Sequence, residues 1–121
     1  MRKRVLVVED HEDNMAIMND MLASADYEVI KAVTGHEGVA MARSEAPDLI
    51  LMDVQLPGID GYEATRQIKG NADLRHIPIV AVTSYALDGE EGRAEEAGCD
   101  AYFSKPVSPR ALLAKVREYI G

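Results

Sequence analysis

Residues 49–61 of the sequence read LILMDVQLPGIDG. A run of four apolar residues that ends in a carboxylate, Asp53, is typical of a strand buried on both faces of a parallel sheet. Pro57 and Gly58 then interrupt the pattern, and Asp60 and Glu63 have the spacing of a helix N-cap and its partner. The stretch therefore predicts one strand–loop–helix unit with an acidic residue at the carboxyl end of the strand.

The same unit recurs along the whole chain, because short β-branched runs alternate with longer stretches of helical periodicity. Five units are expected, which makes the fold α/β, with a five-stranded parallel sheet covered by helices. The predicted strands span 5–9, 28–33, 48–53, 78–83 and 101–104, and the predicted helices span 13–25, 35–46, 60–70, 86–97 and 108–120.

Local signals support further helix starts. Thr34 and Glu37 have capping-box spacing, and Ser108 precedes a proline at the first helical position. The helix over 86–97 is expected to be the most labile of the five. Gly89 and Gly92 fall inside it, and each costs about 1 kcal/mol of helix propensity relative to alanine.

Length and composition limit what the chain can be. With 121 residues, 47% of them hydrophobic, it is expected to form a single domain over 1–121 with no output domain attached. Apolar runs such as Val5–Val8 are far shorter than the ~20 residues that cross a bilayer, which predicts a cytoplasmic protein with no membrane span. A net charge of −8 argues against nucleic acid as a partner and favours cations, including a metal ion.

The strand ends carry the residues that suggest a chemistry. Carboxyl ends of parallel strands meet at one edge of the sheet, and ligands bind there. Crowded carboxylates repel one another unless a cation joins them, and hard oxygen ligands suit Mg²⁺. With that metal, one carboxylate can act as a nucleophile towards phosphorus while an ammonium and a hydroxyl bind the phosphoryl oxygens. The residues expected at this edge are Glu9, Asp10, Asp53 (the nucleophile), Thr83 and Lys105.

Four blocks of the sequence resemble the signature blocks of response-regulator receiver domains of the CheY-like superfamily. They are Val5–Asp10, Leu49–Gly61, Val82–Thr83 and Lys105–Pro106. The resemblance implies a (βα)5 doubly wound, flavodoxin-like three-layer sandwich with strand order 2-1-3-4-5. It also implies a signalling domain rather than an enzyme, one that receives a phosphoryl group on Asp53 from a histidine kinase or a histidine phosphotransfer protein.

The resemblance further implies how a metal would be held. Mg²⁺ is expected on the carboxylates of Asp10 and Asp53 and on the backbone carbonyl of Gln55, with Glu9 acting mainly through water. The Lys105–Pro106 peptide bond is expected to be cis.

By the same resemblance, Thr83 is the switch hydroxyl, Lys105 pairs with the phosphoryl group and Tyr102 is the switch aromatic. When Thr83 moves towards the phosphoryl group, the Tyr102 ring is expected to turn inwards. The change would alter the face formed by the fourth helix, the fifth strand and the fifth helix, which is the predicted surface for a regulated partner protein. The residues expected on that face are Tyr85, Leu87, Tyr102 and Val107.

Several alternatives remain open. The chain most resembles the single-domain receivers of bacterial cell-cycle control, which favours regulation of a partner over the role of an intermediate phosphoryl carrier in a relay. A phosphatase of the haloacid dehalogenase type is disfavoured because Gln55 stands where those enzymes carry a second acid. A flavodoxin-like FMN binder is disfavoured because the acidic segment 9–13 would repel a phosphate. His11 is interpreted as a solvated loop residue, since Mg²⁺ prefers oxygen ligands.

Overall fold

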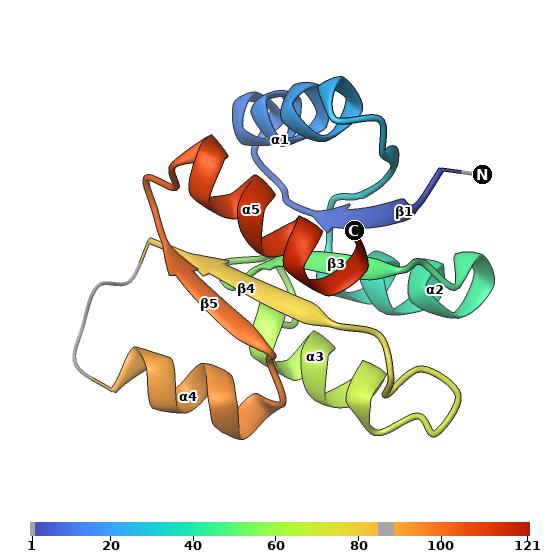
Figure 1. Ribbon diagram of the computed structural model, residues 1–121. Coiled ribbons are helices and arrows are strands. Elements are labelled where there is room, and N and C mark those ends of the chain that lie inside the picture. The colour runs from blue at the N-terminus through green and yellow to red at the C-terminus, as the bar shows by residue number, and fades with distance from the viewer. Residues whose placement is uncertain (1, 85–88) are drawn as a thin grey trace.

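The computed structural model describes residues 2–84 and 89–121, and within them every predicted unit forms (Figure 1). The strands pair in parallel in the order β2-β1-β3-β4-β5, as expected. Strands β1 to β5 span Arg4–Val8, Glu28–Ala32, Leu49–Asp53, Ile79–Thr83 and Ala101–Ser104. Helices α1 to α5 span Glu12–Ser24, Gly35–Glu45, Gly61–Lys69, Glu90–Ala97 and Pro109–Ile120.

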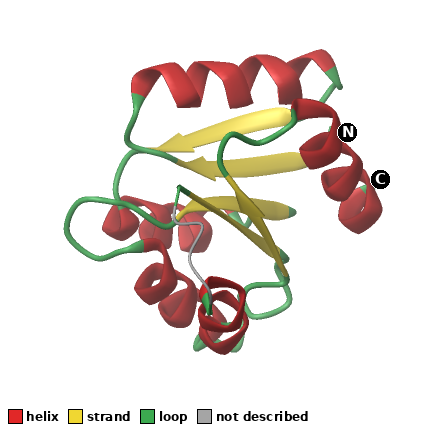
Figure 2. Cartoon of the chain, turned by 90° about the vertical axis from the view of Figure 1, so that its left-hand side faces the viewer, coloured by secondary structure: helices red, strands yellow, loops and turns green. Residues whose placement is uncertain are grey.

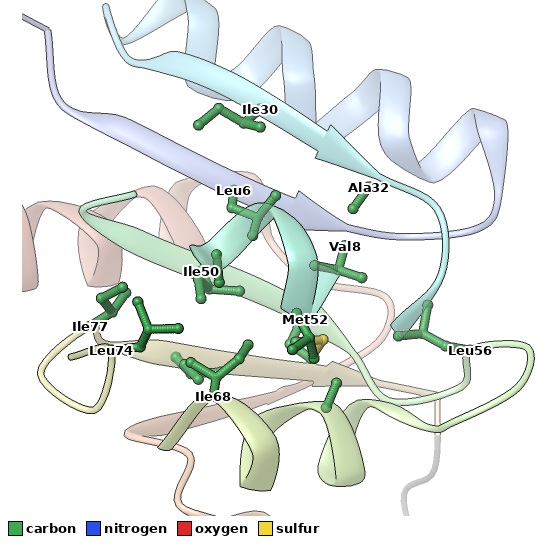
Figure 3. Packing of buried hydrophobic residues seen from close by; sticks show 14 residues of the cluster. Leu6, Val8, Ile30, Ala32, Ile50, Met52, Leu56, Ile68, Leu74 and Ile77 are labelled. Atoms are coloured by element: carbon green, nitrogen blue, oxygen red, sulfur yellow. The ribbon is translucent and has the colours of Figure 1, made fainter. Parts of the chain in front are cut away.

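Helices cover both faces of the sheet (Figure 2). Side chains alternate between these faces along each strand and so divide the core into two clusters. Val5 and Val7 of β1 pack with α1 and α5, whereas Leu6 and Val8 pack with α2 and α3. Figure 3 shows this second cluster, to which β3 contributes Ile50 and Met52. Every residue of β3 and β4 is buried, and both strands are apolar up to their last residues, Asp53 and Thr83.

Helix starts follow the predicted caps at three positions. The side chains of Thr34, Asp60 and Ser108 each accept a hydrogen bond from the backbone N–H three residues later. None of the helices in the described ranges combines the length and the apolar content that a membrane crossing requires.

Helix α4 begins later than predicted. Residues 86–88 of the predicted helix lie outside the described part of the chain, and the helix that is described starts at Glu90. Gly89 was expected inside the helix, but it is the N-cap and its φ of 90° lies in the left-handed region. The prediction was wrong at this point because periodicity alone does not distinguish a glycine within a helix from one that precedes it.

A cluster at the amino ends of β4 and β5 fastens that edge of the sheet. Lys69, the last residue of α3, donates from Nζ to the carbonyl oxygens of Arg75 and Ile77 at 3.1 and 2.9 Å and to Asp100 Oδ2 at 2.9 Å. The same Asp100 oxygen accepts the Ile79 N–H at 2.8 Å. One lysine and one aspartate thus join the end of α3 to the beginnings of two strands.

Gly61 lets α3 start directly against the strand end that carries Asp53. A Cβ atom at position 61 would lie 2.2 Å from the Asp53 carbonyl oxygen and 2.8 Å from Val54 Cα. Both atoms belong to the backbone and cannot rotate away, so a side chain here would push α3 away from β3.

Gly61→Ala should therefore lower the free energy of unfolding by about 1–3 kcal/mol, the usual cost of overpacking. Gly92→Ala is the matched control, because a Cβ on this exposed residue of α4 meets nothing within 4 Å. That variant should gain up to about 1 kcal/mol from helix propensity. Urea denaturation of both variants measures the difference, and equal stabilities would contradict the steric explanation.

Candidate functional site

Acidic side chains gather where β1 and β3 end. The parallel register of these strands brings the residue after β1, Glu9, beside the last residue of β3, Asp53, and the two are only 0% and 2% exposed. Asp10 follows Glu9 and is exposed. Ligand atoms of Glu9, Asp10, His11 and Asp53 all lie within 4.8 Å of one another. The three predicted carboxylates therefore do meet at this edge of the sheet.

Lys105 enters the site from the loop after β5. Its Nζ lies 3.1 Å from Glu9 Oε1 and 3.3 Å from Asp53 Oδ1, and its side chain is mostly buried. The Lys105–Pro106 peptide bond is cis, as expected. One ammonium thus faces two buried carboxylates and a third nearby, which leaves the site with an excess of negative charge.

The two oxygens of Asp53 differ in their surroundings. Oδ1 contacts Lys105 and accepts the backbone N–H of Gln55 at 3.3 Å. Oδ2 is buried and has no hydrogen-bond partner among the described residues. A buried oxygen without a partner is costly, and here it lies among other carboxylates. The donor set therefore fits a hard cation, or an electrophile that reacts with this oxygen.

The pKa values of the buried carboxyl groups Glu9 and Asp53 are shifted in opposite directions. Burial, followed by the negative charge of Glu9, raises the pKa of Asp53 to about 7, against the smaller opposing effect of Lys105. Burial also acts to raise the pKa of Glu9. Its hydrogen bonds with the His11 backbone N–H, Asp53 and Lys105 outweigh that effect and lower the pKa. Near neutral pH, Glu9 is ionised while Asp53 is partly protonated.

Thr83, the last residue of β4, is fully buried and makes a contact that the sequence did not suggest. Its Oγ1 accepts a hydrogen bond from Nε2 of Gln55 at 2.9 Å. The same side-chain amide accepts the N–H of Ser84 through Oε1 at 3.1 Å. The sequence predicted a part in the site only for the backbone carbonyl of Gln55, as a metal ligand. No local pattern indicates the role of its side chain, because the partners are 28 and 29 residues away.

Tyr102 lies outside the acidic cluster. It is half-buried in β5 and packs against the cluster between α3 and α4, whereas Val107 packs with the α1 and α5 cluster. Tyr85 and Leu87, also expected on the partner surface, lie outside the described residues. The structure thus places Tyr102 beside α4 and does not bring it together with Val107 in one apolar cluster.

His11 is two-thirds exposed, yet it borders the acidic cluster. Its Nδ1 lies 3.4 Å from both Glu9 Oε2 and Asp10 Oδ1. Its backbone N–H donates to Glu9 Oε2 at 3.1 Å. Its backbone thus orients Glu9, while its imidazole remains open to solvent.

Comparisons with known proteins agree on one family. The family model described as "Response regulator receiver domain" matches residues 5–117. The polar-differentiation response regulator DivK of Brucella ovis is 44% identical over the whole chain and 98% of its own length.

Two solved structures show the same agreement in three dimensions. The receiver domain of the sensor histidine kinase PA1611 from Pseudomonas aeruginosa, which has a magnesium ion in its active-site cleft, aligns with a TM-score of 0.92 and 36% identity over 100% of this chain and 99% of that one. A CheY-like receiver from Methanospirillum hungatei aligns with a TM-score of 0.90 and 34% identity over 98% and 93%.

The raised pKa of Asp53 predicts how stability depends on pH. A raised pKa stabilises the fold below the ordinary value of 3.8, and this contribution is lost as the pH rises through about 7. In EDTA, Asp53→Asn should therefore gain stability over the native protein between pH 5 and pH 8, on the order of 2 kcal/mol. Urea denaturation at both pH values measures the gain.

Asp20→Asn, an exposed carboxylate on α1, is the control for this pH series and should show no such gain. If the difference in unfolding free energy between Asp53→Asn and the native protein did not change with pH, the buried charge of Asp53 would not be what lowers the stability of the native protein at higher pH.

Proposed function

The chain belongs to the response regulator receiver domain family, and from this we propose that it is a single-domain cytoplasmic phosphoswitch with Asp53 as its phosphorylation site. One observation carries the proposal: Asp53 Oδ2 is buried, without a hydrogen-bond partner in the described chain, and belongs to a carboxylate in contact with Lys105. The likeness to DivK over 98% of the length of that protein supports a role without an output domain.

The donor in this proposal is the phosphohistidine of a histidine kinase or a histidine phosphotransfer protein. An oxygen of Asp53 attacks phosphorus, and the new P–O bond forms as the P–N bond to the imidazole breaks. Lys105, already 3.3 Å from Oδ1, pairs with the negative oxygens of the transferred group. Thr83 then donates its hydroxyl to one of these oxygens.

Mg²⁺ is the cofactor that we propose for this site. Asp10, Asp53 and the carbonyl of Gln55 would hold it, with Glu9 contributing mainly through water. When bound, the ion neutralises charge on the incoming phosphoryl group. Support comes from the clustered carboxylate oxygens and from the magnesium ion in the related receiver of PA1611.

The signal would leave the site through Thr83 and Tyr102. If Thr83 moves towards the phosphoryl group, Tyr102 can change its packing against the cluster between α3 and α4. A partner that binds the face formed by α4, β5 and α5 would respond to that change. We favour such regulation because of the likeness to DivK, and the role of a relay carrier is the alternative.

A groove beside the site offers a place for the donor protein. It has a volume of about 420 Å³ and lies between α1 and the start of α5. Lys105 and Ser84 line the end that adjoins Asp53, while the rest is largely apolar and includes Ile17, which is 59% exposed. A donor docked on this apolar surface would hold its phosphohistidine close to Asp53.

Steady hydrolysis of small phosphate esters fits the site less well. The position two residues after the nucleophile is Gln55, whose amide cannot act as a general acid and which already bonds Thr83 and Ser84. The chain is therefore proposed to catalyse only its own phosphorylation and slow dephosphorylation.

Asp53→Asn should abolish labelling by acetyl phosphate and by a phosphorylated histidine kinase, because an amide cannot act as the nucleophile. The measurement is phosphoprotein electrophoresis in Mg²⁺, with the same reactions in EDTA. Circular dichroism confirms that the variant is folded. Stoichiometric labelling of the folded variant would refute Asp53 as the acceptor.

Ile17→Ser should slow phosphoryl transfer from a protein donor about tenfold, as expected for loss of an apolar anchor at an interface. Labelling by acetyl phosphate should not change, because that donor does not dock on the groove. Val33→Ser is the matched control, since Val33 is also exposed, at 49%, but does not line the groove. Equal slowing of both variants would exclude the groove as the docking surface.

A further inference from the structure

The side chain of Gln55 joins the segment after Asp53 to the end of β4. Its amide nitrogen donates to Thr83 Oγ1 at 2.9 Å, and its amide oxygen accepts the N–H of Ser84 at 3.1 Å. The single planar amide of Gln55 therefore holds two consecutive residues: Thr83 through its side-chain hydroxyl and Ser84 through its backbone N–H. The pair of bonds fixes both the hydroxyl and the direction in which the chain leaves the strand.

Gln55 is also in direct contact with the acceptor. Its backbone N–H donates to Asp53 Oδ1 at 3.3 Å, on the same carboxylate whose Oδ2 has no partner among the described residues. The neighbouring Val54 N–H donates to the Val82 carbonyl at 2.9 Å, which holds the backbones of the two strand ends together. The residue thus connects the carboxylate that would be modified with the hydroxyl that would respond.

We propose that the side chain of Gln55 is a positioning residue that restrains Thr83 in its resting place and so sets how readily the switch turns on. The inference rests on the proposed phosphoswitch function. Since Asp53 Oδ2 has no hydrogen-bond partner within residues 2–84 and 89–121, the Thr83 hydroxyl does not bond it in the resting arrangement. A phosphoryl group on Asp53 would compete with the amide for that hydroxyl.

The surroundings of Gln55 leave its side chain room to move once it is released. It is half-buried and lines an open pocket of about 340 Å³ between the loop after β3 and the start of α4. Thr83, by contrast, is fully buried, and a buried hydroxyl exchanges one partner for another rather than losing partners altogether. The Gln55 amide can therefore move into the pocket while the Thr83 hydroxyl turns to the phosphoryl oxygens.

The restraint predicts tighter binding of beryllofluoride, a phosphoryl mimic, when the amide is removed. In Mg²⁺, Gln55→Met should lower the apparent dissociation constant about fivefold, because the resting state loses a hydrogen bond that the active state does not need. Isothermal titration calorimetry measures the change. Gln55→Asn, whose shorter side chain does not reach Thr83, should behave in the same way and guards against a folding defect in the first variant.

Two controls separate this restraint from a general structural effect. Gln67→Met changes an exposed glutamine on α3 that bonds only Glu63 among the described side chains, and it should bind beryllofluoride like the native protein. Mg²⁺ affinity is measured in parallel for both Gln55 variants, so that any change in metal binding is separated from the change in beryllofluoride binding. Exchange of the Ser84 amide proton, followed by NMR, should become faster in this variant because its acceptor is gone.

A double-mutant cycle tests whether Gln55 acts through the hydroxyl. In a Thr83→Ala background, Gln55→Met should no longer tighten binding. Unchanged or weaker binding by Gln55→Met, or tightening that persists without the Thr83 hydroxyl, would overturn the inference. Failure of the native protein to bind beryllofluoride would instead refute the proposed function itself.

Discussion

An unequal balance of buried charge at the end of the central strand is the constraint on which the site depends. Glu9 and Asp53 lie side by side in the interior, and Lys105 supplies one positive charge to both. The carboxylates are close because the parallel register sets the two strand ends next to each other, and α3 begins immediately behind them. The repulsion between these carboxylates favours the binding of a cation beside them.

Much of this arrangement was predictable, because it follows from periodicity and topology. The run before Asp53 was expected to form a strand over 48–53 and does so over Leu49–Asp53. Once parallel strands are inferred, their carboxyl ends have to share an edge, so Glu9, Asp53, Thr83 and Lys105 were expected close together without knowledge of any contact. Helix caps were equally predictable, since they depend on residues three positions apart.

The rest depends on contacts between distant parts of the chain. Nothing in the segment 53–57 indicates that the Gln55 amide bonds residues at the end of β4. The same holds for the buried Glu90 at the start of α4, whose carboxylate accepts a hydrogen bond from the Tyr62 hydroxyl, 28 residues away in the sequence. A polar side chain that is satisfied across 28 residues leaves no periodic signal, so it is found only when the fold is known.

The cluster around Lys69 and Asp100 has a mechanical consequence. It ties α3 to the beginnings of β4 and β5, at the edge of the sheet away from Asp53. The beginnings of the two strands are therefore held by side-chain bonds that do not involve Asp53, Thr83 or Lys105. Substitutions in this cluster are therefore expected to change the stability of the sheet without altering the charges around Asp53.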